Sequence, residues 1–288
     1  MNKNKITPGL KELLNGYSIE VMPKTAAKIN NFTQLFPQDT LIYIAHIEGT
    51  PINDMLDTAK RLKNEGFSTM PHITARTIRD RNELNSILNK YRDEAGVDSA
   101  LILAGGAKEI YGDFDSSISL LKTGLFDKIG FKKLHFAGHP EGNTDIDTKG
   151  GTTNVDKALV FKKDYAEHTD AKVALVTQFA FDGKAVISWA NRIGKMGIDL
   201  PVVVGVAGPA KLQTLIKFSI ACGVGPSLKV LKRRASDITK LIKPFEPTEV
   251  LLQLNEILTT ETNSQIRGIH FFPLGGIQAT SNWIKENN

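Results

Sequence analysis

Eight short β-rich runs alternate with amphipathic segments along the chain, and this alternation constrains the fold more than any other feature. The runs expected to form strands are Tyr17–Met22, Thr40–His46, Thr69–Thr74, Ala100–Gly105, Leu134–His139, Val173–Phe181, Pro201–Ala207 and Ile269–Leu274. Strands that alternate with helices form right-handed crossovers, so they run parallel in one sheet. Eight such units in 288 residues predict a single (β/α)8 TIM barrel, with residues 1–288 as one domain.

The segments between the strands have helical periodicity. The main ones are Asn53–Glu65, Ile78–Glu94, Val155–Glu167, Lys184–Met196 and Pro209–Ala221, the last with its proline expected in the first turn. An open, doubly wound sheet is the competing architecture. No G-x-G-x-x-G motif follows the first strand, where the chain reads V-M-P-K-T, so the barrel is favoured.

Two segments exceed the minimal barrel. The polar stretch Gly142–Asn154 follows the fifth strand, and long loops after barrel strands lie on the catalytic face, so we expect a lid or ligand-binding loop there. The stretch Pro226–Lys243 adds extra helical material near the C-terminus, before a final helix around Thr248–Leu258.

Composition excludes several classes of protein. Apolar residues make up 41% and charged residues 23%, and no run of eighteen apolar residues exists, so we expect a cytoplasmic protein without a membrane partner. The N-terminus lacks an apolar signal core, and the single Cys222 can form neither an internal disulfide nor a cysteine metal cage.

The net charge of +5 does not predict nucleic-acid binding, because the only dense basic run, Lys229–Arg234, lies in a helical pattern and is interpreted as a solvated face. A site for an anionic ligand, such as a polyglutamylated one, is the alternative.

Polar residues gather where the expected strands end, which is the catalytic end of a barrel. They are Glu20, His46, His72, Thr74, His139, Glu141, Thr177 and Gln178, joined by glycine turns at Gly105-Gly106, Gly205–Gly208 and Gly275-Gly276. No pair has metal-ligand spacing, so no metal is predicted; a metal held by His72, His139 and Glu20 is the alternative.

Glu20 and Gln178 stand out among these residues. Strand alternation places Glu20 on the face opposite Ile19 and Val21, and a desolvated carboxyl group suits general acid catalysis. The alternative role for Glu20 is an ion pair with a barrel lysine. Gln178 ends an apolar strand and can bond a heterocycle, or it can be a core amide bonded to backbone. The glycine turns after the last strands also fit a phosphosugar aldolase or isomerase.

The order of the strand-end motifs resembles the methylenetetrahydrofolate reductase family, which are flavin-dependent (β/α)8 barrels. The segment S-I-E-V-M-P from Ser18 resembles the family's S-F-E-F-F-P, P-H-I-T from Pro71 resembles P-H-L-T, and L-A-G-G from Leu103 resembles L-R-G-D. Further along, A-G-H-P-E from Ala137 resembles A-x-Y-P-E, and V-T-Q-F-A-F-D from Val176 resembles I-T-Q-F-F-F-D. Near the C-terminus, G-V-A-G-P from Gly205 stands where the family has G-I-L-P, and I-H-F-F-P-L from Ile269 resembles F-H-F-Y-T-L. The resemblance spans Tyr17 to Leu274.

The resemblance implies a role for individual residues. Glu20 would be the general acid that protonates folate, Gln178 would contact the pterin, and Phe218 would pack on folate or nicotinamide. FAD would be the cofactor. The flavin ring would contact His72, Gly105, Gly106 and His139. The FAD phosphates and ribose would contact Asp156 and Lys163, with Lys162 in place of Lys163 if the register slips by one.

Several positions depart from the family pattern. Ala45 replaces a threonine, Ala104 an arginine, Gly106 an aspartate, and Gly276 lies in the segment where the family has L-N-R.

We therefore expect an oxidoreductase of one-carbon metabolism and methionine biosynthesis that interconverts 5,10-methylenetetrahydrofolate and 5-methyltetrahydrofolate through FAD, biased toward oxidation of the latter. NADH or NADPH would be the electron donor, and homo-oligomerisation is left open. The alternatives are a non-redox, methyl-transferring folate barrel and a flavin-free binding protein.

Overall fold

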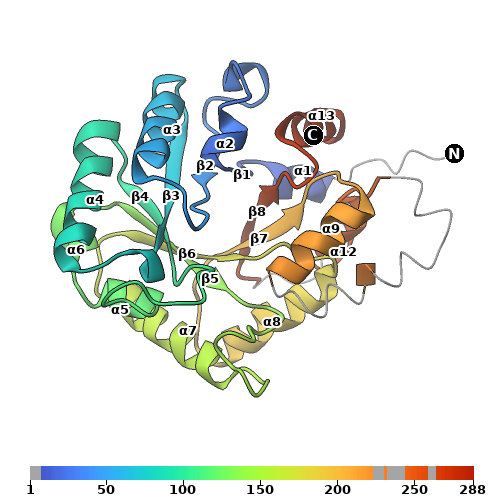
Figure 1. Ribbon diagram of the computed structural model, residues 1–288. Coiled ribbons are helices and arrows are strands. Elements are labelled where there is room, and N and C mark those ends of the chain that lie inside the picture. The colour runs from blue at the N-terminus through green and yellow to red at the C-terminus, as the bar shows by residue number, and fades with distance from the viewer. Residues whose placement is uncertain (1–7, 223–229, 232–243, 259–263) are drawn as a thin grey trace, which may run out of the picture. The chain divides into compact units, whose positions relative to one another are not determined.

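The eight strands form a closed parallel barrel in chain order (Figure 1). The computed structural model describes residues 8–222, 230–231, 244–258 and 264–288. The strands are β1 (Ser18–Val21), β2 (Leu41–Ile44), β3 (Ser68–Thr74), β4 (Ser99–Leu103), β5 (Lys133–Gly138), β6 (Lys172–Thr177), β7 (Val202–Ala207) and β8 (Ile266–Phe272). The predicted TIM barrel is therefore confirmed, and an open doubly wound sheet is excluded.

Helices separate the strands, in most cases close to the expected positions. They are α1 (Pro8–Leu14), α2 (Pro23–Ala26), α3 (Ile52–Asn64), α4 (Arg81–Ala95), α5 (Ser117–Leu121), α6 (Leu125–Ile129), α7 (Thr153–Ala166), α8 (Gly183–Lys195), α9 (Leu212–Ala221), α12 (Thr248–Leu258) and α13 (Ile277–Asn287), with 3-10 turns η1 (Phe32–Gln34) and η2 (Ala75–Thr77). Helix α12 has the expected bounds and lies between α9 and β8 in the chain.

Several boundaries differ from the sequence prediction by one to four residues, and those of β6 and α9 lie next to predicted site residues. Strand β6 ends at Thr177, not Phe181, and beyond it Ala180 forms an isolated bridge to Val206 of β7. Helix α9 begins at Leu212, so Pro209 is not in its first turn. The reason is that the neighbouring Ala210 is extended and exchanges two backbone hydrogen bonds with Phe245. The predicted helical stretch Pro226–Lys243 and the basic run Lys229–Arg234 lie outside the described residues, apart from Val230 and Leu231.

The chain divides into two compact units, which are described separately here. Unit 2 comprises Ser18–Ala137 and Lys157–Leu175, and unit 1 comprises Gly138–Asp156 with the described residues before Ser18 and after Leu175. In unit 2, helices α3 and α4 lie on the outer side of the strands and pack against each other (Figure 1). The buried apolar residues of α3 and α4 recur at helical spacing, which explains why these helices cover the strands.

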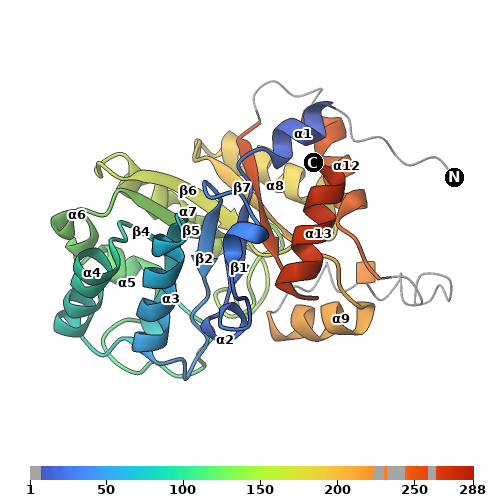
Figure 2. The same ribbon diagram turned by 90° about the horizontal axis from the view of Figure 1, so that it is seen from above.

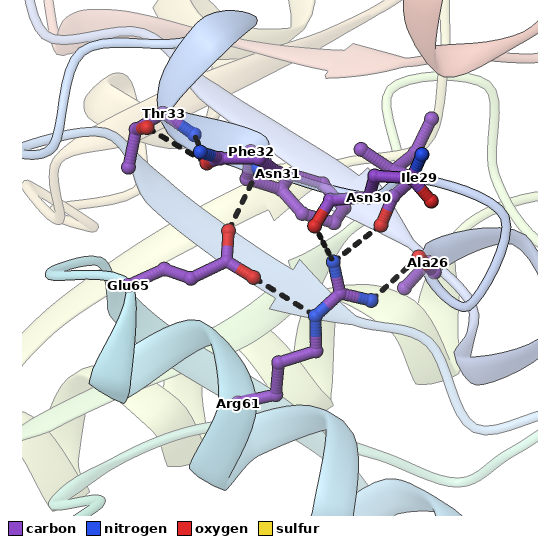
Figure 3. A network of polar contacts seen from close by, with 8 residues as sticks. All are labelled: Ala26, Ile29, Asn30, Asn31, Phe32, Thr33, Arg61 and Glu65. Carbon is purple, nitrogen blue, oxygen red and sulfur yellow. Dashed lines mark hydrogen bonds and ion pairs between the residues drawn. The ribbon is translucent and has the colours of Figure 1, made fainter.

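In unit 2, Arg61 and Glu65 at the end of α3 form a network of polar contacts with the connection between β1 and β2 (Figure 3). Arg61 Nε donates to Glu65 Oε1 (2.8 Å), and its two terminal nitrogens donate to the carbonyl oxygens of Ala26, Ile29 and Asn30. Glu65 Oε2 accepts from the Phe32 backbone (2.7 Å). These bonds satisfy the carbonyl groups of the β1–β2 connection, so the network is structural.

Unit 1 has an aromatic core. Helix α1 packs against α12 and β8, and α12 packs against α8 (Figure 2). The buried cluster contains Phe179, Phe181, Phe245 and Leu215, and the half-buried Phe218 and Phe272 pack against it. Phe179 meets Phe181 and Phe272 edge-to-face, an arrangement that aromatic rings favour.

Candidate functional site

The strand register of unit 2 places four polar side chains on one face of the sheet. Glu20 is the partner of Tyr43 across β1 and β2, and His72 is aligned with Leu101, which is aligned with His135. Partners in parallel strands point to the same face. Tyr43 and His135 come from β2 and β5, which are not adjacent, yet their side chains are hydrogen-bonded, so this face is the interior of the barrel.

Glu20 and His72 form the central pair of this cluster. Glu20 Oε2 lies 3.1 Å from His72 Nε2, and the two side chains are only 17% and 10% exposed. Both residues sit toward the carboxyl ends of their strands, where barrel enzymes carry their catalytic groups. The structure therefore brings together two of the residues that the sequence singled out.

His46 joins the cluster but is fully engaged. Its Nδ1 lies 2.7 Å from Thr74 Oγ1 and its Nε2 lies 3.1 Å from the Thr50 carbonyl oxygen. A carbonyl can only accept, so Nε2 carries the proton and Thr74 donates to Nδ1. Burial lowers the pKa of His46, partly opposed by the Thr50 carbonyl, and nearby His72 lowers it further. His46 is thus a neutral residue that joins the loop after β2 to β3.

The glycine turn after β4 lies against this cluster. Gly105 has φ +96°, and a β-carbon on it would be 3.2 Å from Thr74 Cβ, so only glycine lets the chain pass this closely. A β-carbon on Gly106 would have no atom within 4 Å. There is therefore no space for a side chain at Gly105, beside Thr74, whereas there is space for one at Gly106.

The loop that continues from this turn presents two apolar side chains to solvent. Three backbone hydrogen bonds tie it to the segment after β3: Arg76 N to Ala104 O (3.0 Å), Tyr111 N to Arg76 O (3.0 Å) and Asp113 N to Arg79 O (2.8 Å). Ile110 is nevertheless 51% exposed and Tyr111 67% exposed. Neither residue belongs to a strand-end motif, because the pairing of loops that follow neighbouring strands has no local sequence signal.

Lys162 is buried on the strand-facing side of α7, in line with Val155 and Leu159. Its Nζ donates to the Ala137 carbonyl oxygen (2.9 Å), and burial lowers the pKa of Lys162 to about 8. Val155, Leu159 and Lys162 follow one another at helical spacing, so Lys162 lies on the same buried side of α7 as the two apolar residues. Lysine rarely occupies a buried position of this kind.

The other α7 residues assigned to FAD are bonded within the protein. Asp156 forms a bidentate pair with Arg192 of α8, with both nitrogen–oxygen distances 2.8 Å, and accepts from Thr152 Oγ1. The Arg192 hydrogen bonds hold the pKa of Asp156 below its usual value. Lys163 Nζ lies 2.6 Å from Glu167 Oε1. Their seven-residue spacing places them on one side of the helix, as expected.

The stretch Gly142–Asn154 is ordered around Asp147. Its buried carboxylate accepts from the backbone N–H groups of Asn154 and Val155, so it caps the start of α7. The last two residues of the stretch, Thr153 and Asn154, belong to α7. The loop is therefore shorter than expected, because the helix begins before Val155.

The remaining predicted site residues belong to unit 1. Gln178 is half-buried and its Oε1 accepts from the Phe179 backbone N–H (3.1 Å). Phe218 packs on the aromatic cluster, and His139 is half-buried just after β5. Among the residues that the structure describes, no three His, Cys, Asp or Glu side chains are placed to hold a metal ion. Within those same residues, no helix is both long and apolar enough to cross a membrane.

Comparison with known proteins shows the fold alone. No family model matches the chain. A mutant form of the tryptophan synthase α-subunit of Pyrococcus furiosus has a similar structure, with a TM-score of 0.52 at 12% identity, covering 96% of this chain and 97% of that one. Orotidine 5'-phosphate decarboxylase of Lactobacillus acidophilus gives a TM-score of 0.43 at 13% identity over 94% and 97% of the two chains. The likeness to the tryptophan synthase α-subunit agrees with the closed eight-stranded barrel of this chain, which has the TIM-barrel fold.

Proposed function

We propose that this chain is an enzyme of the methylenetetrahydrofolate reductase type, in which Glu20 donates a proton to folate while hydride passes between folate and a bound flavin. The Glu20–His72 pair carries the proposal. It places a desolvated carboxyl group beside an imidazole at the catalytic end of the strands, 3.1 Å apart. The two residues stand in S-I-E-V-M-P and P-H-I-T, the motifs that resemble the family.

The residues around this pair fit the ring end of a flavin. The backbone at Gly105 passes close to Thr74, and the space beside Gly106 is open, so a planar ring can approach the backbone there. His72, Gly105 and Gly106 would hold this end. Bound FAD would accept or supply the hydride, and NADH or NADPH would be its other partner.

The residues assigned to the phosphate end do not fit in their present arrangement. Asp156 is held by Arg192, Lys163 is paired with Glu167, and Lys162 is buried against the Ala137 carbonyl. In this arrangement the charged groups of these three residues are bonded within the protein. Their assignment stays a prediction from the resemblance.

The chain's own residues account for the proton step. Glu20 is shielded from water, which strengthens its interaction with a charged or polar substrate atom. When 5,10-methylenetetrahydrofolate is reduced, Glu20 would protonate the folate nitrogen that leaves as the five-membered ring opens, and His72 Nε2 would stabilise the carboxylate that remains. When 5-methyltetrahydrofolate is oxidised, the same carboxylate would accept that proton as the ring closes. Gly106 leaves no carboxylate beside the flavin, so we propose that the enzyme favours hydride transfer from 5-methyltetrahydrofolate.

A second candidate is a non-redox folate-binding barrel that transfers a methyl group, or a barrel that binds folate without flavin. The engagement of Asp156 and Lys163 in internal ion pairs favours this candidate, because it needs no phosphate ligands on α7.

The absorption spectrum of the purified protein separates the candidates. A flavin band that bleaches when 5-methyltetrahydrofolate is added without oxygen is the expected result. A colourless protein that fails to bind added FAD but still binds 5-methyltetrahydrofolate would support the second candidate. Absence of binding to both compounds would contradict each.

A further inference from the structure

Tyr43 and His135 form a buried pair in the interior of the barrel, beside Glu20. The Tyr43 hydroxyl oxygen lies 2.5 Å from His135 Nδ1, Tyr43 is fully buried, and His135 is only 7% exposed. Tyr43 is the register partner of Glu20 on the adjacent strand, so the two side chains are neighbours on the inner face. The sequence patterns that indicated the site contain neither Tyr43 nor His135.

The direction of the hydrogen bond between Tyr43 and His135 depends on the tautomer of His135. Burial raises the pKa of Tyr43, hydrogen bonding to the Ser18 side chain opposes this in part, and the negative charge of Glu20 raises the pKa further, so the hydroxyl keeps its proton. We assign Ser18 as the donor to Tyr43 and Tyr43 as the donor to His135 Nδ1; in a neutral His135 ring this assignment leaves the proton on Nε2.

We propose that Tyr43 and His135 are positioning residues for Glu20. The chain Ser18–Tyr43–His135 fixes the Tyr43 oxygen beside the Glu20 carboxyl group and directs that group toward His72. This inference rests on the proposed function for its effect on turnover, but the arrangement itself does not depend on it.

The physical reason is that Tyr43 turns its proton away from Glu20. With its proton held by His135, the hydroxyl presents only lone pairs to its other neighbours, and Glu20 is its register partner. A carboxylate is repelled by those lone pairs, which favours the position in which Glu20 Oε2 lies 3.1 Å from His72 Nε2. Without the hydroxyl, Ser18 is released and can donate to Glu20 instead, which pulls the carboxyl group away from His72.

Tyr43→Phe tests the proposal, with Tyr91→Phe as its control. Tyr91 is also a fully buried tyrosine of unit 2, but its hydroxyl has no hydrogen-bond partner among the described residues. Tyr43→Phe should lower kcat for folate turnover by about 10-fold with KM little changed, because a small misplacement of a catalytic group acts mainly on the chemical step. Tyr91→Phe should leave both parameters unchanged.

A conservative replacement of His135 separates positioning from folding. His135→Gln keeps an acceptor for the Tyr43 hydroxyl and should retain most of the turnover, whereas His135→Leu removes the acceptor and should behave like Tyr43→Phe. Equal kcat in the glutamine and leucine variants would overturn the proposal.

Nitrogen-15 NMR of the histidine side chains gives a readout that needs no turnover. Wild-type His135 should show the neutral Nε2–H tautomer, and Tyr43→Phe should change the nitrogen shifts of His72 as well as those of His135. The His72 shifts should stay at wild-type values in Tyr91→Phe. Wild-type His72 shifts in both Tyr43→Phe and His135→Leu would refute the positioning role even if the protein has a different activity.

Discussion

Glu20 is the residue on which the proposed chemistry depends, so its substitution is the sharpest test at the residue scale. Glu20→Gln keeps the shape of the side chain but removes the transferable proton. We expect folate turnover to fall by at least about 100-fold, while the flavin content and the unfolding curve stay at wild-type levels. Steady-state and single-turnover rates measure the change.

Glu94→Gln is the matched control, because Glu94 lies in helix α4, is exposed and is paired with Lys60. It should behave as wild type. Unchanged turnover in Glu20→Gln would remove Glu20 from the mechanism.

Gly106 is the second residue whose identity predicts a property of the enzyme. Its φ lies outside the left-handed region and a β-carbon would meet no atom within 4 Å, so aspartate can be introduced without a steric clash. A carboxylate near the bound flavin disfavours the extra negative charge of the reduced form. Gly106→Asp should therefore lower the flavin midpoint potential relative to wild type.

Gly106→Asn isolates the charge from the volume of the new side chain. The asparagine variant should have a potential close to that of wild type. A potential in Gly106→Asp that equals or exceeds the asparagine value would contradict the electrostatic explanation.

At the scale of elements, the pair between Asp156 of α7 and Arg192 of α8 makes a pH-dependent contribution. The hydrogen bonds from Arg192 lower the pKa of Asp156, so the stabilisation is complete above about pH 4, the unfolded value, and is lost as the pH falls through the lower folded value. Arg192 is 39% exposed, and solvent screening reduces the contribution to about 1 kcal/mol.

We expect Asp156→Asn to lower the free energy of unfolding by that amount at pH 7, measured by urea denaturation. The difference from wild type should shrink below about pH 3. Asp164→Asn, on the exposed side of the same helix, should have no effect. A loss that stays constant with pH would show that the ion pair is not its cause.

The strands were predictable from sequence and the contacts between them were not. Val, Ile and Leu in short runs identify all eight strands, and alternation places Glu20 opposite Ile19 and Val21. The Tyr43–His135 pair depends on barrel closure, which brings residues 92 positions apart together. Similarly, the seven-residue spacing correctly places Asp156 and Lys163 on one side of a helix. It cannot predict that Asp156 pairs with Arg192, because Arg192 comes from another helix.

At the scale of the whole molecule, the fold says little about the reaction. The tryptophan synthase α-subunit has the same architecture at 12% identity, and one barrel fold supports many chemistries. What is particular to this chain is the polar interior, where alternate strand positions place Ser18, Glu20, Tyr43, His72 and His135 on one face in unit 2. Apolar residues that face the helices supply the hydrophobic stability, so the interior is free to carry polar groups.

Lys162 is an exception to this separation of a polar interior from apolar residues that face the helices, because its amine lies in the apolar layer between the strands and α7. We expect this buried amine to affect the free energy of unfolding of the whole protein. Burial lowers the pKa of Lys162 to about 8, against about 10.4 in an unfolded chain. Between these values the unfolded state binds more protons, so wild-type stability should rise with pH in this window. Below pH 8 the folded protein carries the full cost of the buried charge, about 3 kcal/mol.

Lys162→Met removes this cost but also the hydrogen bond to the Ala137 carbonyl, so the net gain in the free energy of unfolding at pH 7 should be about 1–3 kcal/mol. Urea denaturation at pH 7 and pH 10 measures it, and the gain should be clearly smaller at pH 10, where Lys162 is neutral in the folded protein. Lys172→Met, at an exposed position at the start of β6, controls for the loss of a surface charge. A gain of equal size at both pH values would mean that methionine acts through better packing, and that the buried amine of Lys162 is not a source of pH-dependent instability.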